Sequence, residues 1–195
     1  MIVHKLKYVL ISLSTLFCTM SLFGQQYDLL IKNGTLIDTK SGTNKAMDVA
    51  ISNGKIAEIA NNISIKKAKT VVDADGLIVT PGLLDIHGHV FFGTDENGMY
   101  SGGMSSVAPD NFTFRSGVTT IVDAGSSGWR NFHVFKKQTI DNSKTRVLAF
   151  LNIVGSGMKG GVIEQNVNDM DPKLTAKLVK GHPEIVGVKL AHYEG

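Results

Sequence analysis

Two patterns of hydrophobic and polar residues follow one another along the chain. From residue 27 to about residue 80, short apolar runs alternate with turns, and Asn-Gly pairs at 33–34 and 53–54 stand between such runs. An Asn-Gly pair between apolar runs is a strong signal for a β-hairpin. Val49 and Ile51 stand two residues apart, so they share one face of a strand. This pattern predicts a small antiparallel sheet, in which we find no candidate chemistry.

After residue 77 the pattern changes to longer apolar runs that are separated by helix-like stretches. Asp171 followed by Pro172 is typical of a helix N-cap with proline in the first turn. Near-continuous apolar strands that alternate with helices predict an α/β fold, with a parallel sheet covered on both faces. The apolar runs lie at 78–79 with 83–84, 118–122, 147–154 and 185–190, and the helix-like stretches at about 131–140 and 172–179.

The first 26 residues differ from the rest of the chain. Lys5 and Lys7 precede an apolar stretch at 8–23, and a polar break follows Gly24. This order is typical of a secretory signal peptide, so we predict that residues 1–26 are removed and that the protein is exported, to the periplasm or outside the cell. The alternative is an uncleaved membrane anchor, but a span needs roughly 20 apolar residues. We expect no stable membrane span after cleavage.

Composition and charge exclude several function classes. Of the 195 residues, 43% are hydrophobic and 19% are charged, which is typical of a globular protein. The net charge of +3, from 20 Lys and Arg against 17 Asp and Glu, is too small for a nucleic-acid binder. Cys18, the one cysteine, lies in the predicted signal peptide. The mature chain is therefore expected to hold neither a disulfide nor a thiolate metal site.

Candidate chemistry lies at the end of the first strand of the α/β part, where residues 81–89 read Pro-Gly-Leu-Leu-Asp-Ile-His-Gly-His. Residues two apart in a strand point to the same side, so Asp85, His87 and His89 share one face. Two imidazoles about 7 Å apart along one strand can converge on one metal ion. The alternative is a pair of ordinary polar residues at a strand end.

A second candidate, Lys189, stands in the otherwise apolar run Ile-Val-Gly-Val-Lys-Leu-Ala at 185–191. Lysine is rarely buried without a partner, and burial lowers the pKa of its amine and frees it as a nucleophile. Such an amine can capture carbon dioxide to form a carbamate, whose oxygens can bridge two divalent ions. The alternative is a strand-end lysine whose amine extends into solvent.

Four stretches of the sequence resemble the amidohydrolase superfamily, in its dihydroorotase-like deacetylase branch. They are Asp-Leu-Leu-Ile-Lys-Asn-Gly at 28–34, Gly-Leu-Ile-Val-Thr-Pro-Gly-Leu-Leu-Asp-Ile-His-Gly-His at 76–89, Arg-Ser-Gly-Val-Thr-Thr-Ile-Val-Asp-Ala-Gly at 115–125 and Val-Gly-Val-Lys at 186–189. The resemblance implies a TIM (β/α)8 barrel preceded by a small β-sandwich. Residues 27–80 would then supply strands of the sandwich, and residues 81–195 the first four strands of the barrel.

The resemblance also implies the chemistry of the site. His87 and His89 would bind the more buried of one or two Zn²⁺ ions, and Lys189, carboxylated by carbon dioxide, would bridge the two ions. The implied reaction is attack of metal-activated hydroxide on a small-molecule amide, cyclic amide or ester, such as an N-acyl amino acid or an acylated hydroxy acid. A homo-oligomer is compatible with this resemblance.

The chain is short for this family. A (β/α)8 barrel takes about 250 residues, and the general-base aspartate and two further histidines are expected beyond residue 195. We therefore expect an N-terminal fragment that is hydrolytically inactive alone. The alternative is a non-catalytic remnant that binds a metal or a partner chain.

Other polar residues have weaker signals. His133, His182 and His192 are expected to be surface or packing residues: the first lies in a helix-like stretch, the second in a turn before a strand, and the third has the opposite parity to Lys189 along its strand. Ser126 and Ser127 follow the second strand of the α/β part, where they could contact a ligand or cap the next helix. The Gly- and Ser-rich stretch at 94–114 is expected to form a loop that selects the substrate.

Overall fold

The structure is a computed structural model that describes residues 24–92, 106–190 and 192–195. Most of the predicted signal peptide and the first part of the predicted loop at 94–114 lie outside these residues. Contacts between residues divide the chain after Pro81 into two compact units, which are described separately. Within the described residues, no helix is both long enough and apolar enough to cross a membrane.

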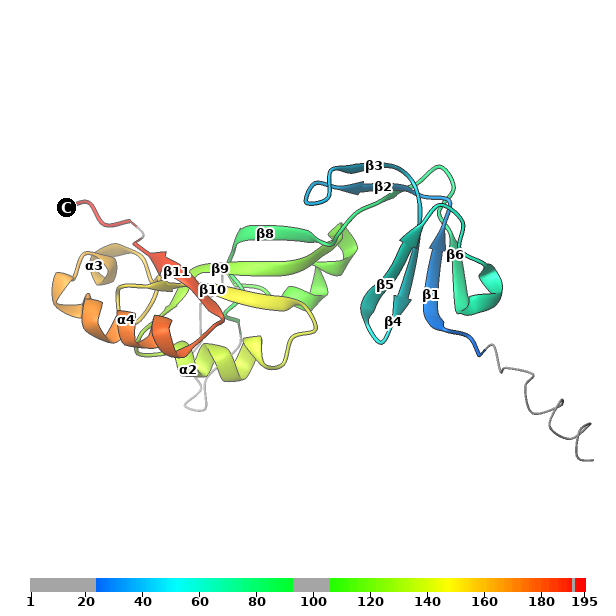
Figure 1. The fold of residues 1–195 in the computed structure, drawn as a ribbon. Helices are drawn as coiled ribbons and strands as arrows, with labels where there is room; N and C mark the ends of the chain where they lie inside the picture. Colours follow the sequence, from blue (N-terminus) through cyan, green and yellow to red (C-terminus); the bar gives the residue numbers. More distant parts are fainter. Residues whose placement is uncertain (1–23, 93–105, 191) are drawn as a thin grey trace, which may run out of the picture. The chain divides into compact units, whose positions relative to one another are not determined.

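The first unit contains two small β-sheets (Figure 1). The larger has the order β5-β4-β1-β6, with strands Lys55–Ala60, Asp48–Ser52, Tyr27–Lys32 and Ala68–Asp73. The smaller has the order β3-β2-β7, with strands Thr43–Ala46, Thr35–Asp38 and Ile78–Val79, and a 3-10 turn at Ile65–Lys67 precedes β6. Strand β6 runs parallel to β1, and β7 runs parallel to β2. The sheets are therefore mixed, and the prediction of an antiparallel sheet is wrong for these two pairs.

The two Asn-Gly pairs have different roles. Asn53 and Gly54 have positive φ angles of 52° and 69° and join β4 to its antiparallel neighbour β5, which confirms the predicted hairpin. Asn33, with φ of 65°, lies where the chain leaves the larger sheet for the smaller, and β1 does not pair with β2. The hairpin predicted at 33–34 is therefore wrong. A Cβ atom on Gly34 would lie 2.5 Å from Cγ2 of Val79, so close packing excludes a side chain there.

A buried carboxylate connects the strands of the larger sheet. The residue Asp48 is 1% exposed, and its side chain accepts hydrogen bonds from Lys32 Nζ at 2.7 Å, Asn33 N at 3.0 Å and Ile63 N at 2.8 Å. Burial alone would raise the pKa of Asp48, but these hydrogen bonds outweigh it and lower the pKa. The carboxylate is therefore held in its charged form between β1, β4 and the segment before β6.

The second unit is built on a four-stranded parallel sheet with the order β11-β10-β9-β8 (Figure 1). The strands are β8 at Leu83–Gly88, β9 at Val118–Gly128, β10 at Arg146–Asn152 and β11 at Ile185–Lys189. The helices are α2 at Phe132–Phe135, which continues as a π-helix at Lys136–Ile140, α3 at Gly161–Glu164 and α4 at Pro172–Gly181, and short 3-10 turns lie at Pro109–Asn111, Phe114–Ser116 and Val167–Asp169. The predicted α/β fold with a parallel sheet is confirmed in this unit.

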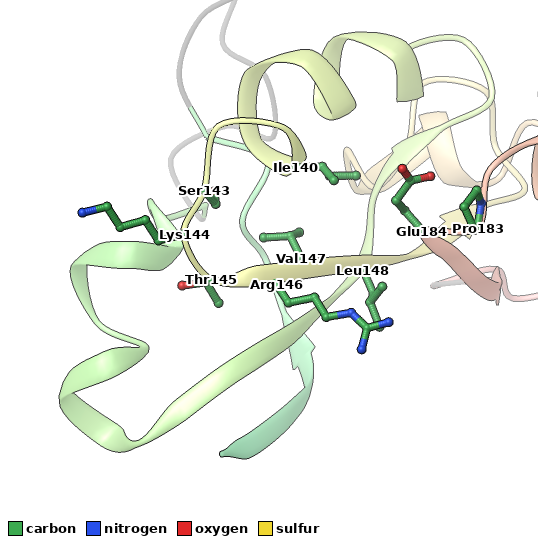
Figure 2. Close-up of a pocket in the computed structure, with 9 residues that line it drawn as sticks. All are labelled: Ile140, Ser143, Lys144, Thr145, Arg146, Val147, Leu148, Pro183 and Glu184. Atoms are coloured by element: carbon green, nitrogen blue, oxygen red, sulfur yellow. The ribbon is translucent and has the colours of Figure 1, made fainter. Parts of the chain in front are cut away.

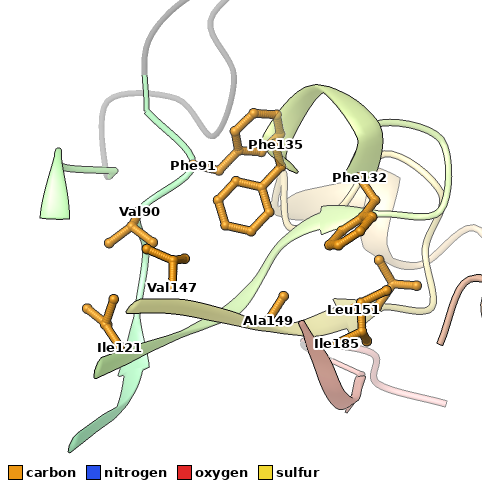
Figure 3. Packing of buried hydrophobic residues seen from close by; sticks show 9 residues of the cluster. All are labelled: Val90, Phe91, Ile121, Phe132, Phe135, Val147, Ala149, Leu151 and Ile185. Carbon is orange, nitrogen blue, oxygen red and sulfur yellow. The ribbon is translucent and has the colours of Figure 1, made fainter. Parts of the chain in front are cut away.

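Helix α4 begins as predicted, because Asp171 Oδ1 accepts hydrogen bonds from the backbone N–H groups of Lys173 and Leu174, both at 2.9 Å. The core of the unit lies between α2 and the sheet (Figure 3). Its buried residues are Val90, Phe91, Ile121, Phe132, Phe135, Val147, Ala149, Leu151 and Ile185. Leu178 and Val179 of α4 pack against the same cluster. Helices α2 and α4 therefore cover one face of the sheet, whereas helices on both faces were expected.

Candidate functional site

The predicted site residues lie at the carboxyl ends of the two outer strands. His87 lies near the end of β8, His89 directly follows that strand, and Lys189 is the last residue of β11. Strands β9 and β10 lie between them. Since all four strands are parallel, their carboxyl ends lie at the same end of the sheet. Ligands bind at this end in parallel α/β sheets.

The two imidazoles lie close together. Their ring centroids are 5.7 Å apart and their planes are inclined at 80°. His87 is exposed and His89 is half-buried. A zinc–nitrogen bond is about 2 Å long, so two rings that bind one ion have centroids within roughly 6 Å of each other. The spacing of the pair fits a shared divalent ion. The carboxylate of Asp85, predicted on the same face, accepts a hydrogen bond from His87 N at 2.9 Å.

A hydroxyl group orients the ring of His89. Ser126 Oγ lies 2.9 Å from His89 Nδ1, and the Ser126 hydroxyl also hydrogen-bonds the carboxylate of Asp123. If the hydroxyl donates to the carboxylate, its oxygen accepts the Nδ1–H proton and the lone pair of Nε2 is left for a metal ion. A histidine whose second nitrogen is hydrogen-bonded in this way is typical of metal sites. Ser126 therefore contacts a candidate ligand residue and does not cap the next helix.

Asp123 on β9 is a functional candidate that the sequence pattern did not single out. Its residue exposure is 0%, and its carboxylate accepts hydrogen bonds from Val90 N at 2.8 Å and Ser126 N at 2.7 Å. Burial raises the pKa of Asp123, although these hydrogen bonds oppose the shift. Burial also lowers the pKa of His89. The charge of Asp123 opposes this shift, whereas the charges of His87, Lys189 and His192 add to it.

Lys189 approaches the same segment from the opposite edge of the sheet. A Cβ atom on Gly125, which has φ of 90°, would lie 2.7 Å from Lys189 Cγ. Asn152, which is fully buried, donates from Nδ2 to Gly125 O at 3.2 Å and holds this backbone in place. Gly125 directly precedes Ser126, so His89 and Lys189 contact adjacent residues of β9.

A second histidine–carboxylate contact lies just beyond β11. His192 Nδ1 is 2.8 Å from Glu164 Oε2, and Glu164, in α3, is 0% exposed. His192 was expected to be a surface or packing residue, and no regular spacing connects it with Glu164. Of the other histidines, His133 is exposed, and His182 packs on Phe132 with ring centroids 5.0 Å apart.

The side chains of His87, His89 and Lys189 are of types that bind divalent ions, but they do not complete the coordination of an ion. Imidazole nitrogen suits Zn²⁺, and a carboxylated lysine would add oxygen donors. Among the described residues, no group of three or more His, Cys, Asp or Glu side chains is arranged to hold a metal ion. Any ion held by His87, His89 and Lys189 therefore needs further ligands.

A hollow of about 300 Å³ lies elsewhere in the second unit (Figure 2). Arg146, Val147 and Leu148 at the start of β10 line it, together with Pro183 and Glu184 before β11. It therefore lies at the amino ends of the strands. Glu184 within it forms an ion pair with Lys136 through Oε1 at 2.8 Å, so one of its carboxylate oxygens is already engaged.

In comparisons with known proteins, the chain is similar to deacetylases and dihydroorotases over part of their length. No family model matches it. It is 31% identical over 168 residues to a deacetylase of Enterococcus faecalis, covering 84% of the chain and 41% of that protein. It is 51% identical over 61 residues to a dihydroorotase of Lactococcus lactis, covering 31% of the chain and 14% of that protein.

The fold has a similar relative. A solved adenine deaminase structure matches 83% of the chain with a TM-score of 0.66 and 31% sequence identity. The match covers 40% of that structure. The chain therefore spans well under half the length of the proteins that it matches over most of its own length.

Proposed function

Because the chain belongs to the amidohydrolase superfamily, we propose that it supplies the first part of the active site of an exported, metal-dependent hydrolase. His87 and His89 would bind a divalent ion, Zn²⁺ in the first instance, and Lys189 would complete or bridge the site as a carbamate. The substrate would be a small molecule with an amide, cyclic amide or ester bond. This follows the names of the relatives, a deacetylase and a dihydroorotase.

One observation carries the metal proposal. The two imidazole rings lie 5.7 Å apart, and Ser126 engages Nδ1 of His89, so Nε2 is the nitrogen available for an ion. Asp123 holds Ser126 through both its backbone N–H and its hydroxyl. A bound divalent ion would polarise a carbonyl group and lower the pKa of a bound water toward about 7.

We further propose that the four-stranded sheet is the first half of an eight-stranded barrel. Strands β8, β9, β10 and β11 lie side by side in sequence order, as in a (β/α)8 barrel. Both outer strands carry exposed apolar side chains: Leu84 is 57% and Ile86 61% exposed on β8, and Val186 is 49% and Val188 52% exposed on β11. Such edges favour pairing with further strands.

A zinc titration tests the metal proposal. We expect the chain to bind Zn²⁺ and the His87→Ala/His89→Ala double variant to lose at least about tenfold in affinity, because both imidazole donors are removed. His133→Ala is the matched control, since His133 is exposed on α2 and should not affect binding. Equal zinc affinity in the double variant and the control would remove the site assignment.

Lys189 is tested in the same titration. Bicarbonate should raise zinc uptake by the unmodified chain and leave uptake by Lys189→Ala unchanged, because the carbamate proposed to bind the ion forms on the Lys189 amine. A bicarbonate effect of equal size in both proteins would show that Lys189 is only a strand residue. Export is tested separately, by the N-terminal sequence of the secreted protein, which should begin near residue 27.

A further inference from the structure

We propose that Glu164 and His192 form a binding position for the carboxylate group of an anionic substrate, beside the site of His87, His89 and Lys189. The inference rests on the proposed function and narrows its substrate class. It favours acyl compounds with a free carboxylate, such as N-acyl amino acids or acylated hydroxy acids, over neutral cyclic amides.

The pairing of the two residues leaves one nitrogen of His192 available. Glu164 is fully buried, and its carboxylate accepts hydrogen bonds from Gly160 N at 2.6 Å and from His192 Nδ1 at 2.8 Å. A buried carboxylate is costly unless a positive partner compensates it, and an imidazole that carries both N–H protons would be such a partner. The imidazole side chain is 67% exposed, and Nε2 has no hydrogen-bond partner among the described residues. The Nε2–H group can then donate to an anion.

The backbone around His192 is held in an uncommon conformation. Its φ angle of 54° lies in the left-handed region, which few residues other than glycine adopt. The side chain of Gln165 donates to the carbonyl oxygen of His192 and accepts a hydrogen bond from Glu194 N at 3.2 Å. Adjacent residues of the 160–165 segment therefore hold both the ring and the backbone. A strained residue that its surroundings hold in place in this way is typical of functional positions.

The position of His192 connects it with the proposed metal site. It stands three residues beyond Lys189, whose stem passes over Gly125, and the next residue, Ser126, contacts His89. Burial lowers the pKa of His89, and the nearby side chains of His87, Lys189 and His192 lower it further, so these basic groups lie near one another at this end of the sheet. A carboxylate bound at His192 would lie beside them.

A third metal ligand is a less suitable role for His192. Although His87, His89 and His192 are all described, no three such side chains are arranged to hold a metal ion in the described part of the chain. A hydrogen-bond donor for the outer end of a substrate needs no such convergence. The geometry therefore favours recognition of a substrate group at some distance from the ion.

The test is an NMR titration of the histidine side chains in metal-free buffer, where no bound ion can attract a carboxylate. The probes are N-acetylglycine, which is anionic, and N-acetylglycinamide, which has the same shape without the charge. The His192 resonances should shift saturably with N-acetylglycine and show at least about tenfold weaker binding of N-acetylglycinamide. His192→Gln should weaken binding of N-acetylglycine at least tenfold, and the control His133→Gln should leave it unchanged.

Folding and metal binding are measured on the same variants. The His192 side chain is mostly exposed, so His192→Gln should keep the thermal unfolding temperature of the unmodified chain and its zinc affinity within about twofold. Equal shifts with both probes, or unchanged N-acetylglycine binding in His192→Gln, would overturn the proposal. Loss of zinc affinity in His192→Gln would also overturn it, because His192 would then belong to the metal site. Failure of the His87–His89 zinc assignment alone would leave the anion titration interpretable, so the two proposals fail separately.

Discussion

Each unit of the protein contains a buried aspartate, and the two differ in how they are compensated. Asp48 in the first unit and Asp123 in the second are at most 1% exposed, and each accepts hydrogen bonds from two backbone N–H groups. Asp48 also pairs with Lys32 at 2.7 Å, and its pKa is lowered. For Asp123, no ion pair is found among the described residues, and its pKa is raised.

The difference separates a structural carboxylate from a functional one. Lys32 compensates the charge of Asp48, and two backbone N–H groups hold its carboxylate inside the sheet, so its role is structural. Asp123 instead hydrogen-bonds Ser126, whose hydroxyl contacts the half-buried ring of His89. Groups whose pKa values are shifted by burial without a compensating partner are enriched at functional sites.

The largest effect that we expect is the loss of the structural carboxylate. Asp48→Ala should lower the free energy of unfolding by about 3–5 kcal/mol, because it leaves the charge of Lys32 and two backbone N–H groups without their partner. The matched control is Asp28→Ala, which breaks a solvent-exposed pair with Lys69 and should therefore change the free energy of unfolding far less.

Urea unfolding can be followed in each unit. Trp129, the one tryptophan, lies in the second unit, so its fluorescence reports that unit, whereas far-UV circular dichroism reports both. Asp48→Ala should shift the circular dichroism transition and leave the fluorescence transition in place. A shift of both by the same amount would mean that the two units unfold together.

A smaller effect is the pH dependence of stability, which should have opposite signs for the two aspartates. The pKa of Asp48 is lowered from 3.8, so its contribution to stability is present above that value and is lost as the pH falls through the lowered pKa. The pKa of Asp123 is raised from 3.8, so its contribution is fully present below that value and is lost as the pH rises through the raised pKa.

Asp48→Asn and Asp123→Asn therefore separate the two contributions, since asparagine does not titrate. As the pH falls from 7 toward 3, the stability advantage of the unmodified chain over Asp48→Asn should shrink, and its advantage over Asp123→Asn should grow. Urea midpoints at several pH values measure both differences. Parallel trends in the two variants would refute the contrast between the aspartates.

Local signals predicted much of the fold. The Asp171 cap and the Asn53–Gly54 hairpin depend on neighbouring residues, and the four parallel strands follow from continuous apolar runs. The Asn33–Gly34 turn misled because contact with Val79, from a distant strand, determines its role. The parallel pairing of β6 and β7 depends on similarly distant partners.

The residues of the candidate site also fall into two groups, those that local sequence predicts and those that depend on distant contacts. His87 and His89 could be found because a strand places residues two apart on one side. The Glu164–His192 contact joins residues 28 positions apart, one in a short helix and one in a loop, so no period connects them. The role of Asp123 emerges only when the end of β9 is seen to lie beside His89.

The smallest effect that we expect tests the link between Asp123 and His89. Ser126→Ala removes the hydroxyl that holds His89 Nδ1 but keeps the backbone N–H that donates to Asp123. Loss of such a supporting hydrogen bond typically costs 10- to 100-fold in metal affinity, and we expect about tenfold for Zn²⁺ here. Stability should change little, because alanine fits the space of serine.

The matched control is Ser127→Ala. The Ser127 hydroxyl is buried without a hydrogen-bond partner among the described residues, so its loss should leave zinc affinity unchanged. Zinc titrations of the two variants, with urea midpoints beside them, decide the point. Equal zinc affinity in both would mean that Asp123 does not act on His89 through Ser126, and the contrast with Asp48 would then concern stability alone.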